Sequence, residues 1–174
     1  MSREHLQHTS EWLFSTCEEL FQGTQAVAEG AWFSLMSLLP KTPLNSHSLL
    51  ELVAWACISI SAKCRGFQVS NEALCKLLGG GFTCNTLTQV ELYVLQKTSL
   101  QAPPAAISEL CTFLTEDQTV LDLALKVIKK WACKLTLLRC TPEEAAVASV
   151  LWALKDLGRE EEKQALMAQL QWRS

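Results

Sequence analysis

Two stretches rich in small apolar residues, residues 53–66 and 145–158, stand out in the hydrophobic pattern of the chain. Each is apolar almost all round, which is typical of a helix at the centre of a bundle. Each also ends in a glycine at the place where a left-handed C-terminal cap belongs. A repeated central helix predicts one helical unit that is used twice. Aligned without a gap, the two stretches share Ala54/Ala146, Ala56/Ala148, Lys63/Lys155 and Gly66/Gly158.

Helical spacing continues along nearly the whole chain, and no alternating strand pattern of useful length appears. Pro103 and Pro104 form the best internal boundary, so we expect an all-α protein in two parts. Start and stop signals predict helices over residues 3–21, 24–39, 46–64, 70–79, 86–97, 105–114, 119–138, 142–157 and 160–170. Thr24 is expected to cap the second helix, and the third and fifth can also start at Ser48 and Thr88. Thr141 opens the eighth with the strongest signal, because proline and two glutamates follow it.

Composition excludes several classes of protein. Apolar residues make up 49% of the 174 residues, so the chain can bury a core. A net charge of −3 without a long charge run argues against nucleic-acid binding, which usually leaves a basic face. The longest apolar stretch, residues 49–62, contains Glu51 and is too short to span a bilayer, and no signal peptide is visible.

Little in the sequence suggests an enzyme, a metal site or a cofactor. The eight cysteines form no CxxC pair and are scattered, which favours reduced, buried thiols over a zinc site. Three histidines near the N-terminus offer little for acid–base catalysis. The glycine run at residues 79–81 lacks the lysine of a phosphate-binding loop and predicts a turn. The cysteines expected at apolar helix positions are Cys57, Cys64, Cys75, Cys111 and Cys133.

A set of short motifs follows the order and spacing of the cyclin box. Residues 11–19 (EWLFSTCEE) resemble the Asp-Trp-Leu and Glu-Glu of the first cyclin-box helix. Residues 50–63 (LELVAWACISISAK) resemble the central helix, which ends in Ala-Ser-Lys. Residues 81–83 with 89–92 (QVEL) resemble the loop and Met-Glu of the fifth helix, and residues 100–104 (LQAPP) the run into the second repeat. The chain therefore resembles cyclins from about residue 4 to residue 158, and the segment at residues 63–75 is most similar to D-type cyclins.

This resemblance implies an all-α, cyclin-like fold with two five-helix-type repeats. It implies an N-terminal cyclin box at residues 1–102 and a shortened repeat at residues 103–174. The implied function is non-enzymatic: a nuclear and cytoplasmic regulatory subunit that binds a cyclin-dependent kinase and moves its regulatory helix into the active position. No cofactor, membrane or nucleic acid is implied.

The resemblance also assigns the residues that contact the kinase. They are Lys63, at the end of the central helix, and Glu91, on the fifth helix, with the neighbours Cys64, Leu95 and Leu100. A lysine and a glutamate side by side offer a donor and an acceptor, which can hold backbone groups at the end of a partner helix. The residues alone leave a second interpretation open, in which the two side chains only pair with each other.

The chain departs from the cyclin pattern at a buried ionic cluster. Cyclins usually place an arginine, an Asp-Arg pair and an aspartate there, and this chain has Leu6, Met36, Ser37 and Glu11. Because the changes occur together, no charge need be stranded in the core and the fold need not be lost. We expect Glu11 to be exposed or to have a new partner.

The substrate-docking patch of many cyclins is altered as well. Trp12 is retained, but Glu51 replaces a glutamine, and the other matching positions hold His5, His8 and Thr9. These changes argue against docking of Arg-x-Leu substrates and fit a viral or lineage-specific cyclin. They also support an alternative function, a non-activating cyclin-fold adaptor or decoy that recruits transcription or cell-cycle regulators. A nucleic-acid-binding cyclin fold of the transcription-factor type conflicts with the acidic balance.

Overall fold

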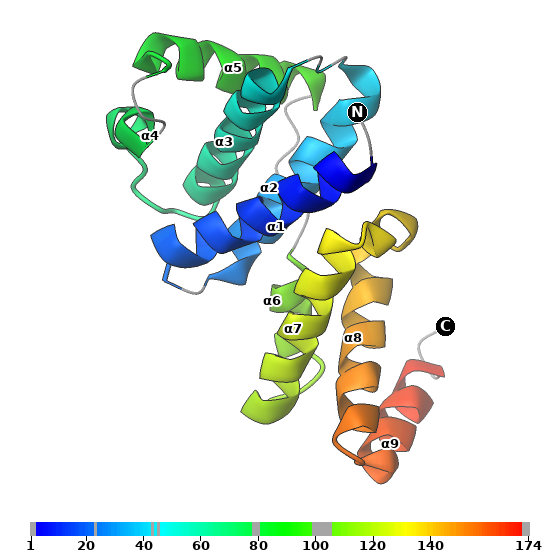
Figure 1. The fold of residues 1–174 in the computed structure, drawn as a ribbon. Coiled ribbons are helices and arrows are strands. Elements are labelled where there is room, and N and C mark those ends of the chain that lie inside the picture. The colour runs from blue at the N-terminus through cyan, green and yellow to red at the C-terminus, as the bar shows by residue number, and fades with distance from the viewer. Residues whose placement is uncertain are drawn as a thin grey trace. The chain divides into compact units, whose positions relative to one another are not determined.

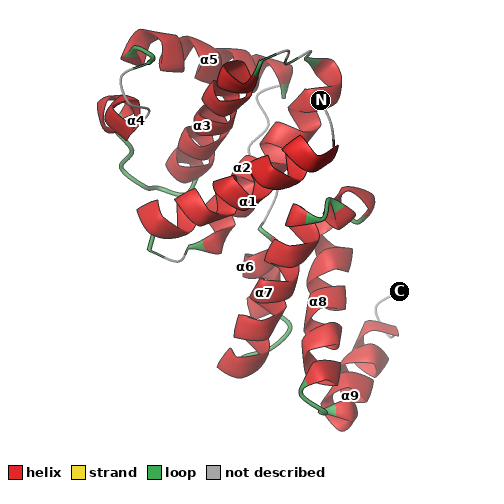
Figure 2. Ribbon diagram, viewed as in Figure 1, coloured by secondary structure: helices red, strands yellow, loops and turns green. Residues whose placement is uncertain are grey.

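The computed structural model describes residues 3–22, 24–42, 44, 46–77, 81–98 and 106–171. Every regular element within these ranges is a helix, which confirms the all-α class (Figure 2). The chain divides into two compact units, unit 1 (Met1–Pro104) and unit 2 (Ala105–Ser174). Their assignment as cyclin box and shortened repeat stays a prediction, and the proline boundary itself lies outside the described residues.

Unit 1 is built around its third α-helix, α3, which packs against α1, α2 and α5 (Figure 1). Leu50 and all residues from 52 to 62 of α3 are buried, as its apolar pattern predicts. Ser46 caps its start by accepting a hydrogen bond from the backbone N–H of Leu49 at 3.2 Å. The elements of unit 1 are α1 (Arg3–Leu20), α2 (Gln25–Leu38), the 3₁₀ turn η1 (Leu39–Lys41), α3 (His47–Cys64), α4 (Asn71–Leu77) and α5 (Cys84–Lys97).

Two buried hydrogen bonds fix the position of α2. The Ser61 hydroxyl of α3 donates to the Val27 carbonyl of α2 at 2.8 Å. The Trp32 indole N–H of α2 donates to the Ser10 hydroxyl of α1 at 3.0 Å. Because a buried polar group without a partner is costly, these bonds favour one arrangement of the three helices.

Unit 2 is a smaller helical bundle in which α8 packs against α6, α7 and α9. The expectation that α8 is buried almost all round is wrong, because Trp152 on this helix is 42% exposed. Helices α6, α7 and α9, which pack against α8 within unit 2, leave this side chain partly uncovered. The elements are α6 (Ile107–Thr112), α7 (Gln118–Cys133), the 3₁₀ turn η2 (Thr136–Arg139), α8 (Pro142–Asp156) and α9 (Glu160–Gln171).

The same terminating turn follows α3 and α8, as the repeated sequence pattern predicts. Gly66 and Gly158 adopt left-handed φ angles of 80° and 70°. Each glycine N–H donates three residues back, and the next N–H donates five residues back. These bonds are Gly66–Lys63 (3.1 Å), Phe67–Ala62 (3.1 Å), Gly158–Lys155 (3.0 Å) and Arg159–Leu154 (2.9 Å).

Some predicted helix limits are wrong. Helix α5 begins at Cys84, because the Thr83 side chain accepts a hydrogen bond from the backbone N–H of Thr86 and caps the helix earlier than predicted. Helix α7 ends at Cys133, since Leu135 adopts a left-handed φ of 60° and interrupts the helix that was expected to reach residue 138. Thr24 stands at the start of α2 without a capping side-chain bond. The predicted cap at Thr141 is confirmed.

An ion pair ties the start of α7 to the turn between α8 and α9. One carboxylate oxygen of Asp117 accepts hydrogen bonds from the backbone N–H groups of Thr119 (2.8 Å) and Val120 (3.1 Å). The other oxygen accepts from Arg159 Nη1 at 2.6 Å. The hydrogen bond from Arg159, assisted by the Val120 N–H, lowers the pKa of Asp117 below its ordinary value. The ionised form of Asp117 therefore stabilises unit 2.

Replacing Asp117 by asparagine keeps a capping oxygen and removes the charge. A folded-state pKa below the unfolded value stabilises the fold above the ordinary aspartate pKa, about 3.9, and this contribution is lost as the pH falls through the folded-state pKa. We expect a lower Tm for Asp117→Asn than for the wild type at pH 7, and convergence of the two values as the pH falls through the folded-state pKa of Asp117. Circular dichroism melts measure both. Equal Tm values at pH 7 would contradict the account.

Candidate functional site

Lys63 and Glu91, the two residues assigned to kinase contact, lie together at the surface of unit 1. Lys63 is in the last turn of α3, and Glu91 lies near the middle of α5. The Lys63 ammonium donates a hydrogen bond to Glu91 Oε1 at 2.7 Å. The lysine side chain is 38% exposed, whereas the glutamate side chain is only 11% exposed. The carboxylate therefore lies beneath the surface, and the ammonium reaches solvent.

Asn71, the first residue of α4, completes this arrangement, although no sequence motif indicates it. Its Oδ1 accepts a hydrogen bond from the Lys63 ammonium at 2.9 Å. Its Nδ2 donates to Thr88 Oγ1 at 3.0 Å and to Glu91 Oε2 at 3.4 Å. Three helices thus meet at four side chains, and we call Lys63, Asn71, Thr88 and Glu91 the polar cluster.

The structure describes two of the three apolar residues that are assigned to the same contact. Cys64 is exposed beside Lys63, and Leu95 is half-buried one turn after Glu91 on α5. Leu100 lies outside the described residues. Leu92, 55% exposed and three positions before Leu95, is a further apolar residue on this face of α5. The polar cluster is therefore bordered by apolar side chains that a partner could cover.

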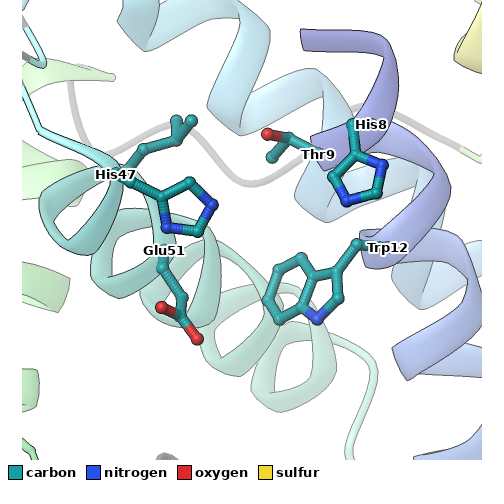
Figure 3. A pocket seen from close by; sticks show the side chains of 6 residues that line it. His8, Thr9, Trp12, His47 and Glu51 are labelled. Atoms are coloured by element: carbon teal, nitrogen blue, oxygen red, sulfur yellow. The ribbon is translucent and has the colours of Figure 1, made fainter. Parts of the chain in front are cut away.

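A second candidate site is the pocket between α1 and α3, at positions that the cyclin resemblance assigns to a docking patch (Figure 3). Its volume is about 110 Å³, and both Trp12 and Glu51 line it. The Trp12 ring also lies edge-on to Trp55 at 5.5 Å, so it packs α1 onto α3. The exposed lining is more apolar than polar, although two imidazoles, a hydroxyl and a carboxylate contribute to it. The lining residues are His8, Thr9, Trp12, His47, Leu50 and Glu51.

Glu11 is exposed at the surface of unit 1, which is one of the two outcomes expected for it.

No helix in the described ranges is long and apolar enough to cross a membrane. Among the residues with described positions, no group of three or more His, Cys, Asp or Glu side chains can hold a metal ion.

The cysteines differ widely in accessibility. Cys57, Cys75 and Cys111 are buried as expected, and Cys133 is half-buried. The expectation of burial is wrong for Cys64, which is exposed. Cys64 is exposed because α3 leaves the core at its last turn. Burial raises the pKa of Cys17 and of Cys57 to about 12, which suppresses their thiolate forms.

No family model and no curated protein matches this chain.

The polar cluster predicts a measurable coupling between Lys63 and Glu91. Lys63→Met keeps the aliphatic stem but removes the main partner of a largely buried carboxylate, and we expect it to lower the free energy of unfolding by about 1 kcal/mol. Glu91→Leu should add little in the Lys63→Met background, because no stranded charge then remains. Urea unfolding of the single and double variants measures the coupling. Additive effects would contradict the pairing.

Proposed function

We propose that this chain is a cyclin-like regulatory subunit that binds a cyclin-dependent kinase through unit 1, with Lys63 as its central contact. The observation that carries the proposal is the Lys63–Glu91 pair. The two residues are 28 positions apart in sequence, were assigned to one contact from the cyclin resemblance, and lie 2.7 Å apart at the surface. The all-α fold around a buried central helix is compatible with the proposal.

The chemistry of Lys63 suits the end of a partner helix. A lysine ammonium has three N–H donors, and Glu91 and Asn71 take two of them. The last carbonyls of a helix lack intrahelical partners and carry partial negative charge. The remaining donor can satisfy such a carbonyl, while Cys64, Leu92 and Leu95 exclude water around the contact.

Activation in this proposal is conformational, and its energetic demand is large. Moving a kinase helix from 1:99 to 99:1 in favour of the active position requires about 5.5 kcal/mol of differential binding. A single charge-assisted hydrogen bond supplies about 1.5–3 kcal/mol. The lysine contact alone is therefore insufficient, and apolar side chains near the polar cluster must supply the remainder.

The docking pocket favours a second candidate function, a cyclin-fold adaptor or decoy that holds a partner without activating a kinase. His8 and Thr9 stand in this lining at positions where the cyclin docking patch has apolar side chains, although Trp12 and Leu50 keep much of the lining apolar. A subunit with this pocket could bind a kinase and still fail to recruit Arg-x-Leu substrates. Kinase activity in the purified complex separates the two functions.

Affinity capture tests the proposal directly. We expect the wild-type chain to retain a cyclin-dependent kinase from cell lysate, and the Lys63→Ala/Glu91→Ala double variant to lose it. Lys155→Ala is the matched control, because Lys155 occupies the corresponding last-turn position of α8. Mass spectrometry identifies the kinase, and titration with the purified kinase gives the affinities. Equal affinity of the wild type and the double variant would show that the contact does not depend on the Lys63–Glu91 pair.

Alkylation of cysteines gives an independent footprint of the contact. Cys64 and Cys140 are both exposed, but only Cys64 adjoins the polar cluster. We expect the bound kinase to slow the reaction of Cys64 with N-ethylmaleimide and to leave Cys140 of unit 2 unchanged, as peptide mass spectrometry can measure. Unaltered alkylation of Cys64 in a saturated complex would place the contact elsewhere.

A further inference from the structure

The polar cluster exposes a hydrogen-bond donor to a partner but largely buries its carboxylate acceptor. Glu91 accepts hydrogen bonds at both carboxylate oxygens, from Lys63 and from Asn71, and its side chain is 11% exposed. The Lys63 side chain is 38% exposed and has one N–H beyond the two bonds described. The cluster thus presents a donor to solvent and keeps its acceptor below.

The orientation of the Asn71 amide follows from its neighbours. The Thr88 hydroxyl donates to the Cys84 carbonyl at 2.9 Å, so its lone pairs remain to accept from Asn71. The amide NH₂ therefore belongs on the side of Thr88 and Glu91, and the amide oxygen on the side of Lys63. A flipped amide would place N–H donors against the ammonium and remove the hydrogen bond that Asn71 donates to Glu91 Oε2.

We propose that Asn71 is a positioning residue for the partner contact, one that acts through Lys63. Asn71 and Glu91 together hold the ammonium in place, so that Lys63 presents its third N–H to an acceptor of the partner. In this inference the partner touches Lys63 and not Glu91, which departs from the direct contact that the cyclin resemblance assigns to both residues. This inference rests on the proposed function and specifies its chemistry: the partner contributes an acceptor, either a helix-terminal carbonyl or a carboxylate.

Holding the Lys63 side chain in place before binding increases the affinity for the partner, because less conformational entropy is then lost on binding. A free lysine side chain has many rotamers, and restricting them at an interface reduces the affinity. Two hydrogen bonds that hold the ammonium before the partner arrives remove part of that cost. Asparagine suits the position because it accepts from Lys63 while it donates to Thr88 and Glu91. Aspartate would add a second negative charge beside Glu91 and offer no donor.

A binding cycle tests this role, with affinities titrated against the cyclin-dependent kinase that the wild type binds from a panel of purified kinases. We expect Asn71→Ala to weaken binding about fivefold in the wild-type background, the size of one hydrogen bond. In the Lys63→Met background, Asn71→Ala and Glu91→Ala should each have no further effect. Asn85→Ala, at an exposed asparagine of α5, is the matched control and should bind as the wild type does.

Several outcomes would overturn the inference. A loss from Asn71→Ala that is as large in the Lys63→Met background would mean a structural role, and a further loss from Glu91→Ala there would mean direct contact by the carboxylate. Where Lys63→Met binds too weakly to titrate, Lys63→Gln replaces it in the same cycle. Unchanged binding by Asn71→Ala, with weakened binding by Lys63→Met, overturns this inference alone. A wild-type chain that binds no kinase of the panel overturns the proposed function as well.

Discussion

Burial of α3 is the constraint on which the rest of unit 1 depends. A helix buried from residue 52 to residue 62 needs neighbours on every side, and α1, α2 and α5 provide them. The same helix must return the chain to solvent at its end. Ala62 is fully buried and Lys63 is exposed, and Gly66 then reverses the chain in a left-handed turn. The lysine therefore stands at the point where the core meets the surface.

The polar cluster follows from this placement. An ammonium at the C-terminal end of a helix complements the unpaired carbonyls there, and the largely buried Glu91 requires a donor. Asn71 satisfies both side chains from a third helix. In the polar cluster, hydrogen bonds hold the Lys63 ammonium before any partner arrives, which lowers the entropic cost of the binding that we propose.

The sequence predicts those features of the fold that depend on the local pattern of residues. The burial of α3, the glycine turns and the cap at Thr141 follow from periodicity and from the chemistry of single positions. The start of α5 was misplaced because threonines at 83, 86 and 88 all offer the same capping signal. The break at Leu135 could not be foreseen, since a left-handed leucine has no local signature.

The candidate site shows the same limit. Lys63 and Glu91 were found together through the cyclin resemblance, whereas Asn71 and Leu92 depend on how α3, α4 and α5 meet in space. An asparagine at the start of a short helix is typical of a cap, so its sequence context conceals its contact with Lys63. The burial of Glu29 is also not predicted by the local sequence. This residue of the mainly apolar helix α2 is 1% exposed and accepts a hydrogen bond from Gln25 at 2.9 Å.

The central claim is that the chain regulates a kinase by binding it, and the activity of the purified complex tests this most directly. The measurement is the rate of phosphate transfer to a protein substrate by the captured kinase, alone and with a saturating amount of the chain. The account predicts a rate well above that of the kinase alone, with Lys63→Met requiring a higher concentration for the same effect. A kinase that binds the chain and remains at its basal rate would contradict the account and identify an adaptor or decoy.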